Sequence, residues 1–352
     1  MGPGRKLALS NQTTATRRKY AVHGLAVELV SEVPLVQQEA EAWLWPFAVD
    51  ALPDGIVCTG GQIRQYDAGE VMRHLSPTAV PVATPGQLLE LYQEGERFWL
   101  VDDRWGLCEI NVMRGTWRSW ILPQPTLDPV RVAEMAVMWP MAQLLRPRGL
   151  YLLPAAAAVR RGYGVLVLSP FNIEGELRAL VELGYGLIGQ RWVAVREEGG
   201  RIELLGMPGQ IEREASPRLR DASLGPASRW VDLTSEYCDI ARPHAFCDAV
   251  IVVEPSRRPT AHVTEVADQR ATDAIRRAWP ITELHPFRKY GQLPLKLSNA
   301  CRCWSAQLSR RPEDLLVLLD SIQSPECTAI VTLPAGARMS APPGGTMMRM
   351  AI

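Results

Sequence analysis

Hydrophobic and polar residues alternate in short runs over the first third of the chain, which is the pattern of half-buried β-strands. Residues 20–29 alternate in this way, and further strand-like runs at 56–66 and 97–120 are broken by glycine and aspartate. We therefore predict a small, mostly antiparallel, β-rich domain over residues 20–125. Its boundary is marked by Pro123, Pro125 and Pro129.

The spacing of apolar residues then changes to that of an α-helix. Asp128 is placed as the N-cap and Pro129 as the first helical residue, Pro140 is expected to kink the helix, and Gly149 ends it. Strand-like runs, a helix near 173–183 and an uninterrupted apolar run at 249–254 follow. Residues 293–306 are expected to be irregular or strand-like, and 311–322 to form a final helix. This alternation of element types predicts a mixed α/β (α+β) domain over 126–333.

The two ends of the chain have a different composition. Residues 1–19 are basic and rich in glycine and threonine, and residues 334–352 contain the run Pro342-Pro343-Gly344-Gly345. We expect a disordered tail at the start and a flexible tail at the end, because such segments bury little apolar surface.

Charge and cysteine content narrow the function classes. Lysine plus arginine equals aspartate plus glutamate at 38 each, so the balance favours neither a nucleic-acid nor a membrane partner. No apolar run is long enough to span a bilayer. The seven cysteines are scattered without the paired spacing of a zinc site. We expect reduced cysteines, no metal and a cytoplasmic protein.

The stretch 149–195 forms the frame of a phosphate-binding loop: strand, turn, helix, then two more strands. Leu153-Pro154-Ala155 and the run from Gly184 to Val195 resemble the HPr-kinase family with its PEP-carboxykinase-like core. The segment from Tyr20 to Leu35 is similar to the opening of kinase-like proteins found in peptide natural-product gene clusters. The resemblance implies a kinase-like core after the N-terminal domain, and thus an ATP and Mg²⁺ site.

The nucleotide chemistry of that family is missing at the matching positions. Taking Leu177 as the leucine after the loop, the loop glycines fall on Leu168, Phe171 and Ile173, the lysine on Glu174 and the serine on Gly175. Glu174 would repel phosphate, and no lysine occurs between Lys19 and Lys289. Gln190 and Arg191 replace the acidic pair that would hold Mg²⁺. We therefore predict a degenerate loop, no cofactor, no catalytic residues and no kinase activity.

Other candidate residues have two interpretations each. Arg160 and Arg161, in the turn before Val165, could contact an anion or could simply be solvated. His244 and Cys247 could form a Cys/His site, although a loop entering a buried strand explains them better. The arginines of the loop at 206–229 could bind an acidic peptide or keep the loop soluble.

Four tryptophans are the candidate peptide contacts. They are more dense in the N-terminal domain than core packing requires, and an extended peptide could add to an open sheet edge near residues 96–121. The alternative is that all four fill the core. These residues are Trp99, Trp105, Trp117 and Trp120.

The function that this resemblance implies is that of a catalytically inactive, pseudokinase-like peptide-binding protein. It is similar to the peptide-binding proteins of crocagin-type pathways, which make ribosomally synthesised, post-translationally modified peptides (RiPPs). The expected partners are a precursor peptide and modifying enzymes of the same pathway. Two alternatives stay open: an enzyme of another chemistry that uses the vacated nucleotide pocket, and a non-catalytic partner subunit of an active kinase.

Overall fold

The computed structural model describes most, but not all, of the two predicted domains. The described residues are 15–52, 59–66, 72–82, 90–169, 184–207, 210–212, 230–232, 242–254, 262–278, 292–307, 319 and 330–332. The expected helices near 173–183 and 311–322 and the loop arginines at 213–229 lie outside these ranges, apart from the single helical residue Leu319.

The N-terminal part is an eight-stranded sheet in the order β1-β2-β3-β8-β7-β6-β5-β4. The β2–β3 and β3–β8 pairs are parallel and the others are antiparallel, so the expectation of a mostly antiparallel sheet is confirmed. Its strands are β1 (Thr16–Val22), β2 (Leu25–Ser31), β3 (Thr59–Gln65), β4 (Val80–Val82), β5 (Glu90–Glu94), β6 (Arg97–Asp102), β7 (Gly106–Asn111) and β8 (Thr116–Ile121).

The first strand corrects the expected start of order near Tyr20. It begins at Thr16, which pairs with Ser31 of β2, so residues 16–19 belong to the sheet and not to a tail. These residues are polar and basic because β1 is an edge strand and its first residues face solvent. The alternation of hydrophobic residues therefore does not reveal this part of the strand.

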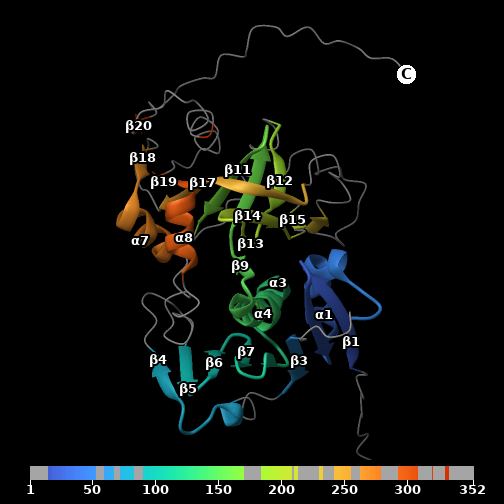
Figure 1. Cartoon of the computed structure of the whole chain (residues 1–352). Helices are drawn as coiled ribbons and strands as arrows, with labels where there is room; N and C mark the ends of the chain where they lie inside the picture. Colours follow the sequence, from blue (N-terminus) through green and yellow to red (C-terminus); the bar gives the residue numbers. More distant parts are fainter. Residues whose placement is uncertain are drawn as a thin grey trace, which may run out of the picture.

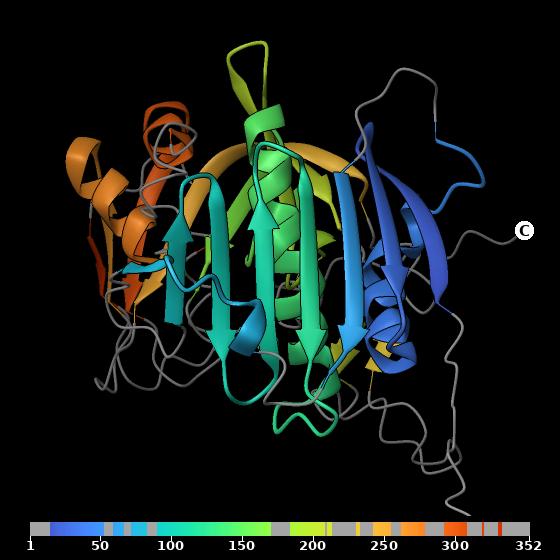
Figure 2. The ribbon, with the colours of Figure 1, turned by 90° about the horizontal axis from the view of Figure 1, so that it is seen from below.

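One face of this sheet is covered by helices (Figure 2). They are α1 (Pro34–Leu44), a short 3₁₀ turn (Trp45–Phe47), and a continuous helical segment made of α3 (Pro129–Ala133), a π-helical turn η3 (Glu134–Met138), α4 (Trp139–Leu145) and a final 3₁₀ turn (Arg146–Arg148). A further 3₁₀ turn spans Met72–His74. Asp128 caps the segment by accepting a hydrogen bond from the Arg131 amide, and Gly149 ends it in the left-handed conformation, as predicted.

Proline 140 determines how the helix meets the sheet. Proline has no N–H, so the carbonyl of Ala136, four residues earlier, cannot receive its usual helical hydrogen bond. That carbonyl instead accepts from the Trp117 indole (3.0 Å) and the Ser119 hydroxyl (2.7 Å) of β8. The helix therefore turns π-helical just before Pro140, and the freed carbonyl fixes it to the sheet.

The second sheet has ten strands and mixed pairing. Its centre is the long strand β17, which is parallel to β11 on one side and to β19 on the other, while its first residues pair antiparallel with β14. The strands are β9 (Tyr151–Leu153), β10 (Ala156–Arg160), β11 (Tyr163–Leu168), β12 (Gly186–Gly189), β13 (Val193–Glu198), β14 (Arg201–Gly206), β17 (His244–Glu254), β18 (His262–Val266), β19 (Arg302–Gln307) and β20 (Ile330–Thr332).

The remaining elements lie beside this sheet. Helices α7 (Asp268–Ala278) and α8 (Leu293–Ala300) pack on it, and β15 (Gln210–Glu212) pairs with β16 (Trp230–Asp232) as a separate ribbon. The sequence had predicted an irregular or strand-like segment from Leu293. This was wrong for its first eight residues, where Pro294 occupies the first turn of α8.

The elements form layers, with α3 and α4 between the two sheets (Figure 1). One hydrophobic core joins Leu29 and Trp117 of the first sheet, Val137 of the helix, and Leu152 and Ala194 of the second sheet. Residues that alternate with these, such as Leu153 and Val193, form another core on the opposite face against α7 and α8. The helix after the expected boundary at residue 125 thus shares the core of the sheet before it.

Candidate functional site

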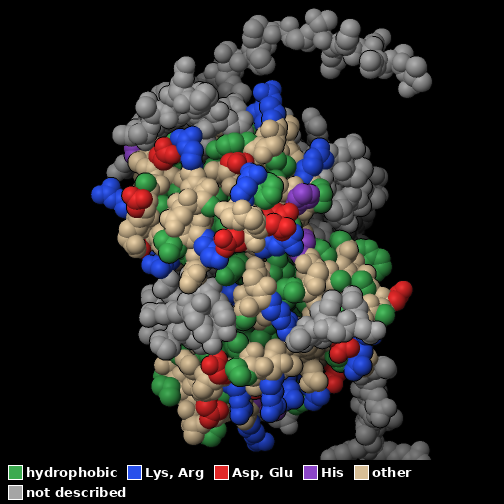
Figure 3. All heavy atoms as spheres, in the orientation of Figure 1, with side chains coloured by type: hydrophobic (Ala, Val, Ile, Leu, Met, Phe, Trp, Pro, Cys, Tyr) green, Lys and Arg blue, Asp and Glu red, His purple; other side chains and the backbone are tan. Residues whose placement is uncertain are grey.

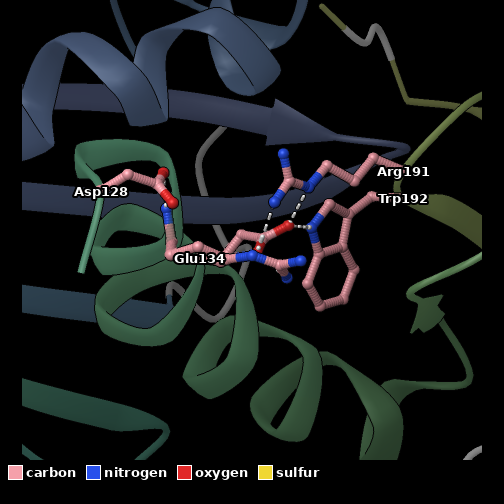
Figure 4. Close-up of polar contacts among 5 residues, drawn as sticks. Asp128, Glu134, Arg191 and Trp192 are labelled. Carbon is pink, nitrogen blue, oxygen red and sulfur yellow. Dashed lines mark hydrogen bonds and ion pairs between the residues drawn. The ribbon is translucent and has the colours of Figure 1, made fainter. Parts of the chain in front are cut away.

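A buried carboxylate lies where the layers meet. Glu134, on the π-helical turn, is 3% exposed. It accepts hydrogen bonds from Nη2 of Arg191 (3.0 Å), Nη1 of Arg131 (2.9 Å) and the indole Nε1 of Trp192 (3.3 Å), and it also pairs with Nε of Arg191 (Figure 4). We call these four residues the Glu134 cluster.

The Glu134 cluster explains what position 191 does in this chain. The turn between β12 and β13 carries Gln190 and Arg191, where the family resemblance places two acids. Arg191 points away from the second sheet towards the helix and neutralises Glu134 (Figure 4). The neighbouring Gln190 is buried, and its Oε1 has no hydrogen-bond partner among the described residues. Position 191 thus joins two layers.

More acids surround this turn. Burial raises the pKa of Glu39 on α1, with a further rise from Asp128, while the positive charge of Arg191 lowers it. Glu39 therefore lies in the field of Asp128 and of Arg191. Glu134 pairs with Arg191 as well, so acids already offset the positive charge that a phosphate would need at this turn.

Only the first two residues of the degenerate loop, Leu168 and Ser169, are described by the structure. Leu168 is the last residue of β11, is buried, and pairs with Val252 of β17. Phe171, Ile173, Glu174 and Gly175 lie outside the described residues. Their predicted inability to hold a nucleotide therefore stays a prediction.

The four candidate tryptophans are all buried, between 0% and 5% exposed. Trp105 and Trp117 belong to the core under the helices, whereas Trp99 and Trp120 pack with Val101 and Leu107 on the other face of the sheet. Their density reflects a sheet with apolar contacts on both faces. Of the two interpretations, burial favours the core role.

The expected docking edge at 96–121 is also absent. Strands β6, β7 and β8 each have a partner on both sides, so their backbone groups are already paired. The edges of this sheet are β1 and β4, and the short β4 contains Pro81, which obstructs the addition of another strand. The prediction failed because β3 inserts next to β8 from far earlier in the sequence.

The tight packing inside this sheet has one clear requirement. A Cβ built on Gly61 of β3 would lie 2.1 Å from a ring carbon of Trp117, whereas one on the preceding Gly60 would meet nothing closer than 3.9 Å. Trp117 therefore needs glycine at position 61, and its ring lies directly against the neighbouring strand.

The outer face of the first sheet carries many basic side chains, and Lys and Arg gather at that end of the molecule in Figure 3. Several of them face glutamates across the strands: Arg17 and Glu28 at 3.6 Å, Arg64 and Glu32 at 3.7 Å. Such exposed pairs neutralise part of the charge and contribute little stability.

A hollow of about 440 Å³ lies at the amino ends of β11 and β17. Four basic side chains line it, together with glycine, alanine, valine and phenylalanine; among the residues that the structure describes, its lining contains no acid. We call it the basic hollow; its basic residues are Arg160, Arg161, Arg242 and His244. The sequence had offered anion contact as one interpretation of Arg160 and Arg161. It gave no reason to bring Arg242 and His244 to them.

The buried thiols are unsuited to nucleophilic catalysis. The pKa of Cys247 is raised mainly by its hydrogen bond with Cys301 and secondly by burial. Burial also raises the pKa of Cys303, to about 12. These thiols therefore stay protonated near neutral pH. Within the described residues no cluster of His, Cys, Asp and Glu has the composition and geometry to hold a metal ion.

Comparison with known proteins gives little further guidance. No protein-family model matches the sequence, and a search of curated proteins finds no match. A solved structure of the HPr(Ser) kinase/phosphatase from Coxiella burnetii aligns at 16% identity with a TM-score of 0.24, over 30% of this chain. The aligned part spans 61% of that protein, and a superposition this loose supports no conclusion on activity. Among the described helices, none has the length and apolar character needed to cross a bilayer.

Proposed function

We propose that this protein is a pseudokinase-like peptide-binding protein that binds a precursor peptide in a RiPP pathway and transfers no phosphate. The observation that carries the proposal is the state of Arg191. An acidic residue there would hold Mg²⁺, but the arginine is committed to the buried Glu134 between the layers. Arg191 thus has a structural role at the position where phosphoryl transfer would need a metal-binding acid.

The basic hollow supports binding of an acidic group instead. Arginine presents a planar set of N–H donors that matches carboxylates in pairs, so several arginines in one concave site favour an anionic ligand. The hollow lies at the amino ends of β11 and β17, whereas Leu168, at which the predicted loop begins, lies at the carboxyl end of β11. A peptide held at the hollow would not occupy the position of the lost nucleotide site.

The test is a titration of fluorescently labelled candidate precursor peptides, chosen from short reading frames near this gene, followed by anisotropy. We expect saturable binding that Mg²⁺-ATP leaves unchanged. Millimolar Mg²⁺-ATP should also leave the melting temperature unchanged, since a ligand at 100 times its Kd would stabilise the fold by about 2.7 kcal/mol.

Radiolabelled ATP supplies the second readout. We expect no label on the peptide with the wild-type chain or with Glu174→Lys, because one lysine restores neither the loop glycines nor the acidic pair. Labelled peptide in either reaction would contradict the loss of kinase activity. A peptide that fails to bind at high micromolar concentration would contradict the binding role.

A further inference from the structure

Three thiols gather on one side of the second sheet, where helix α8 passes into strand β19. Cys247 lies near the start of β17, Cys301 follows the last residue of α8, and Cys303 lies in β19. All three belong to the core against α7 and α8, where they are 6%, 9% and 2% exposed, and all three are free. The proposed function uses none of them.

A β-bulge turns Cys247 towards this side of the sheet. Val250 of β17 faces the core against α7 and α8, so regular alternation would put Asp248 on that side and Cys247 on the other. The pairing of β17 with β11 shifts by one residue after Cys247, which leaves Asp248 as the extra residue. Asp248 instead accepts a hydrogen bond from the amide of Gly164 at 2.8 Å. The bulge therefore re-aims the Cys247 side chain into the core that contains the other two thiols.

The thiols of Cys247 and Cys301 are in contact. Sγ of Cys301 donates to the carbonyl oxygen of Cys247 at 3.3 Å, and the hydrogen bond between the two side chains is the largest cause of the raised pKa of Cys247. The backbone agrees, because β17 runs parallel to β19 with Ala249 opposite Arg302. Extending this register by one residue puts Asp248 opposite Cys301, so the Cα atoms of Cys247 and Cys301 are about 6 Å apart by strand geometry, a separation that a disulfide spans.

The third thiol is less suited to such a bond. Cys303 is opposite Val250, three residues beyond Cys247, which places the Cα atoms of the two cysteines at least about 10 Å apart. Cys301 and Cys303 are alternate residues of one extended segment, with Cα atoms about 6.6 Å apart, at the upper limit for a disulfide. Sγ of Cys303 donates instead to the carbonyl of Cys301 at 3.5 Å. Of the three possible pairs, the geometry favours Cys247 with Cys301.

We propose that Cys247 and Cys301 form a disulfide when the folded chain meets a small oxidised disulfide such as oxidised glutathione. Cys301 reacts first, because its neighbours Ala300 and Arg302 are exposed. Its thiolate attacks one sulfur of oxidised glutathione, which breaks the S–S bond and releases one glutathione thiolate. The thiolate of Cys247 then attacks the Cys301 sulfur and releases the second. The two thiol protons pass to the released glutathiones, so two cysteines are oxidised and one disulfide is reduced.

The redox poise of the surroundings sets the state of this pair. Both attacks need a thiolate, so the raised pKa of Cys247 keeps the reaction slow near neutral pH and makes it faster as the pH rises. In a reducing compartment both thiols stay reduced. Once formed, the bond ties the central strand β17 to the end of α8 and closes a loop of 54 positions, which restricts the unfolded chain. The pair is thus a redox-sensitive staple of the second sheet.

The test exposes the folded full chain to oxidised glutathione at about pH 8 and maps its disulfides by mass spectrometry after proteolysis without reductant. We expect a crosslink between the segments that carry Cys247 and Cys301, the loss of two free thiols and no retained glutathione. The urea midpoint of unfolding should rise, and dithiothreitol should reverse the rise. Cys301→Ala should abolish the crosslink and the shift. The matched control, Cys303→Ala, removes a thiol of the same cluster and should keep both.

A second control concerns a cysteine outside the described residues. Cys238 lies shortly before Cys247 in the sequence, so Cys238→Ala should also keep the crosslink, and its loss in this variant would overturn the proposal. A native chain that keeps all its thiols, or a stable glutathione adduct on a single cysteine, would overturn it as well. The wild-type map decides the matter even where a variant fails to fold. The staple does not depend on peptide binding, so the outcome of the peptide titration leaves it untouched.

Discussion

Arg161 and Arg191 lie in two turns of the same sheet and use their charges in opposite ways. Arg191 turns inward and spends its charge on the buried Glu134. Arg161 stays exposed at the rim of a hollow, and no acid is found among the described residues that line this hollow. The number of arginines in the sequence therefore says little about anion binding. What matters is whether a carboxylate of the protein already forms an ion pair with the arginine.

The largest expected effect concerns the ion pair of Arg191 with the buried Glu134 and its contribution to stability. Glu134→Ala should lower the free energy of unfolding by about 3 kcal/mol, because it removes the buried carboxylate that accepts from Arg191 and from the buried Trp192 indole. Urea denaturation measures the loss.

The control for this change is Glu254→Ala, which removes the half-buried partner of the exposed Arg277. Its cost should stay below about 1 kcal/mol. Equal losses in the two variants would mean that the Glu134 cluster does not hold the layers together.

A smaller effect sets the two arginines against each other directly. Arg191→Ala should destabilise the fold by about 2 kcal/mol, since Glu134 then keeps only Arg131 and Trp192 as donors. Arg161→Asn should leave stability unchanged or raise it slightly, because asparagine suits the turn. Thermal melts of both variants check this. A destabilised Arg161→Asn would show that its charge also supports the fold.

The smallest effect concerns a hydrogen bond between the two sheets, made by the half-buried side chain of His23, whose burial favours the neutral form. His23 donates from Nε2 to the carbonyl of Gly206 in the second sheet (3.0 Å), and burial lowers its pKa. The unfolded chain therefore takes up the proton more readily. The contribution is present above about pH 6.5 and is lost as the pH falls through the unfolded and then the folded pKa.

Unfolding at several pH values checks this behaviour. His23→Gln should flatten the acid-side loss of stability between about pH 7 and pH 5. An unchanged profile in His23→Gln would assign the acid sensitivity to other groups.

Local features were predictable from the sequence. The cap at Asp128, the proline that follows it and the terminating glycine depend on neighbours within one helical turn, and all three hold. The altered helix near Pro140 was expected too. Its form was not, because the π-helical turn depends on donors from β8, well before it in the chain.

Of the candidate site, the sequence predicted only the absence of acidic residues at positions 190 and 191. Comparison with the family pattern was enough to show that Arg191 replaces an acid. Its partner Glu134 was not predictable, because it lies 57 positions earlier on a different element. Trp99 and Trp120 misled for a similar reason. Their side chains sit on the face away from the helices, and only the contacts with Tyr66 and Leu75, in the segment before β4, show that this face is covered too.

The position of β17 at the centre of the second sheet has a consequence for synthesis on the ribosome. The first sheet has all its strands once residue 121 has emerged, because its pairings stay within residues 16–121. Strand β11 emerges by residue 168 but waits for residues 247–252 before its second edge is paired. During that interval the nascent chain exposes an apolar strand edge, which makes this stage of translation the one most in need of a chaperone.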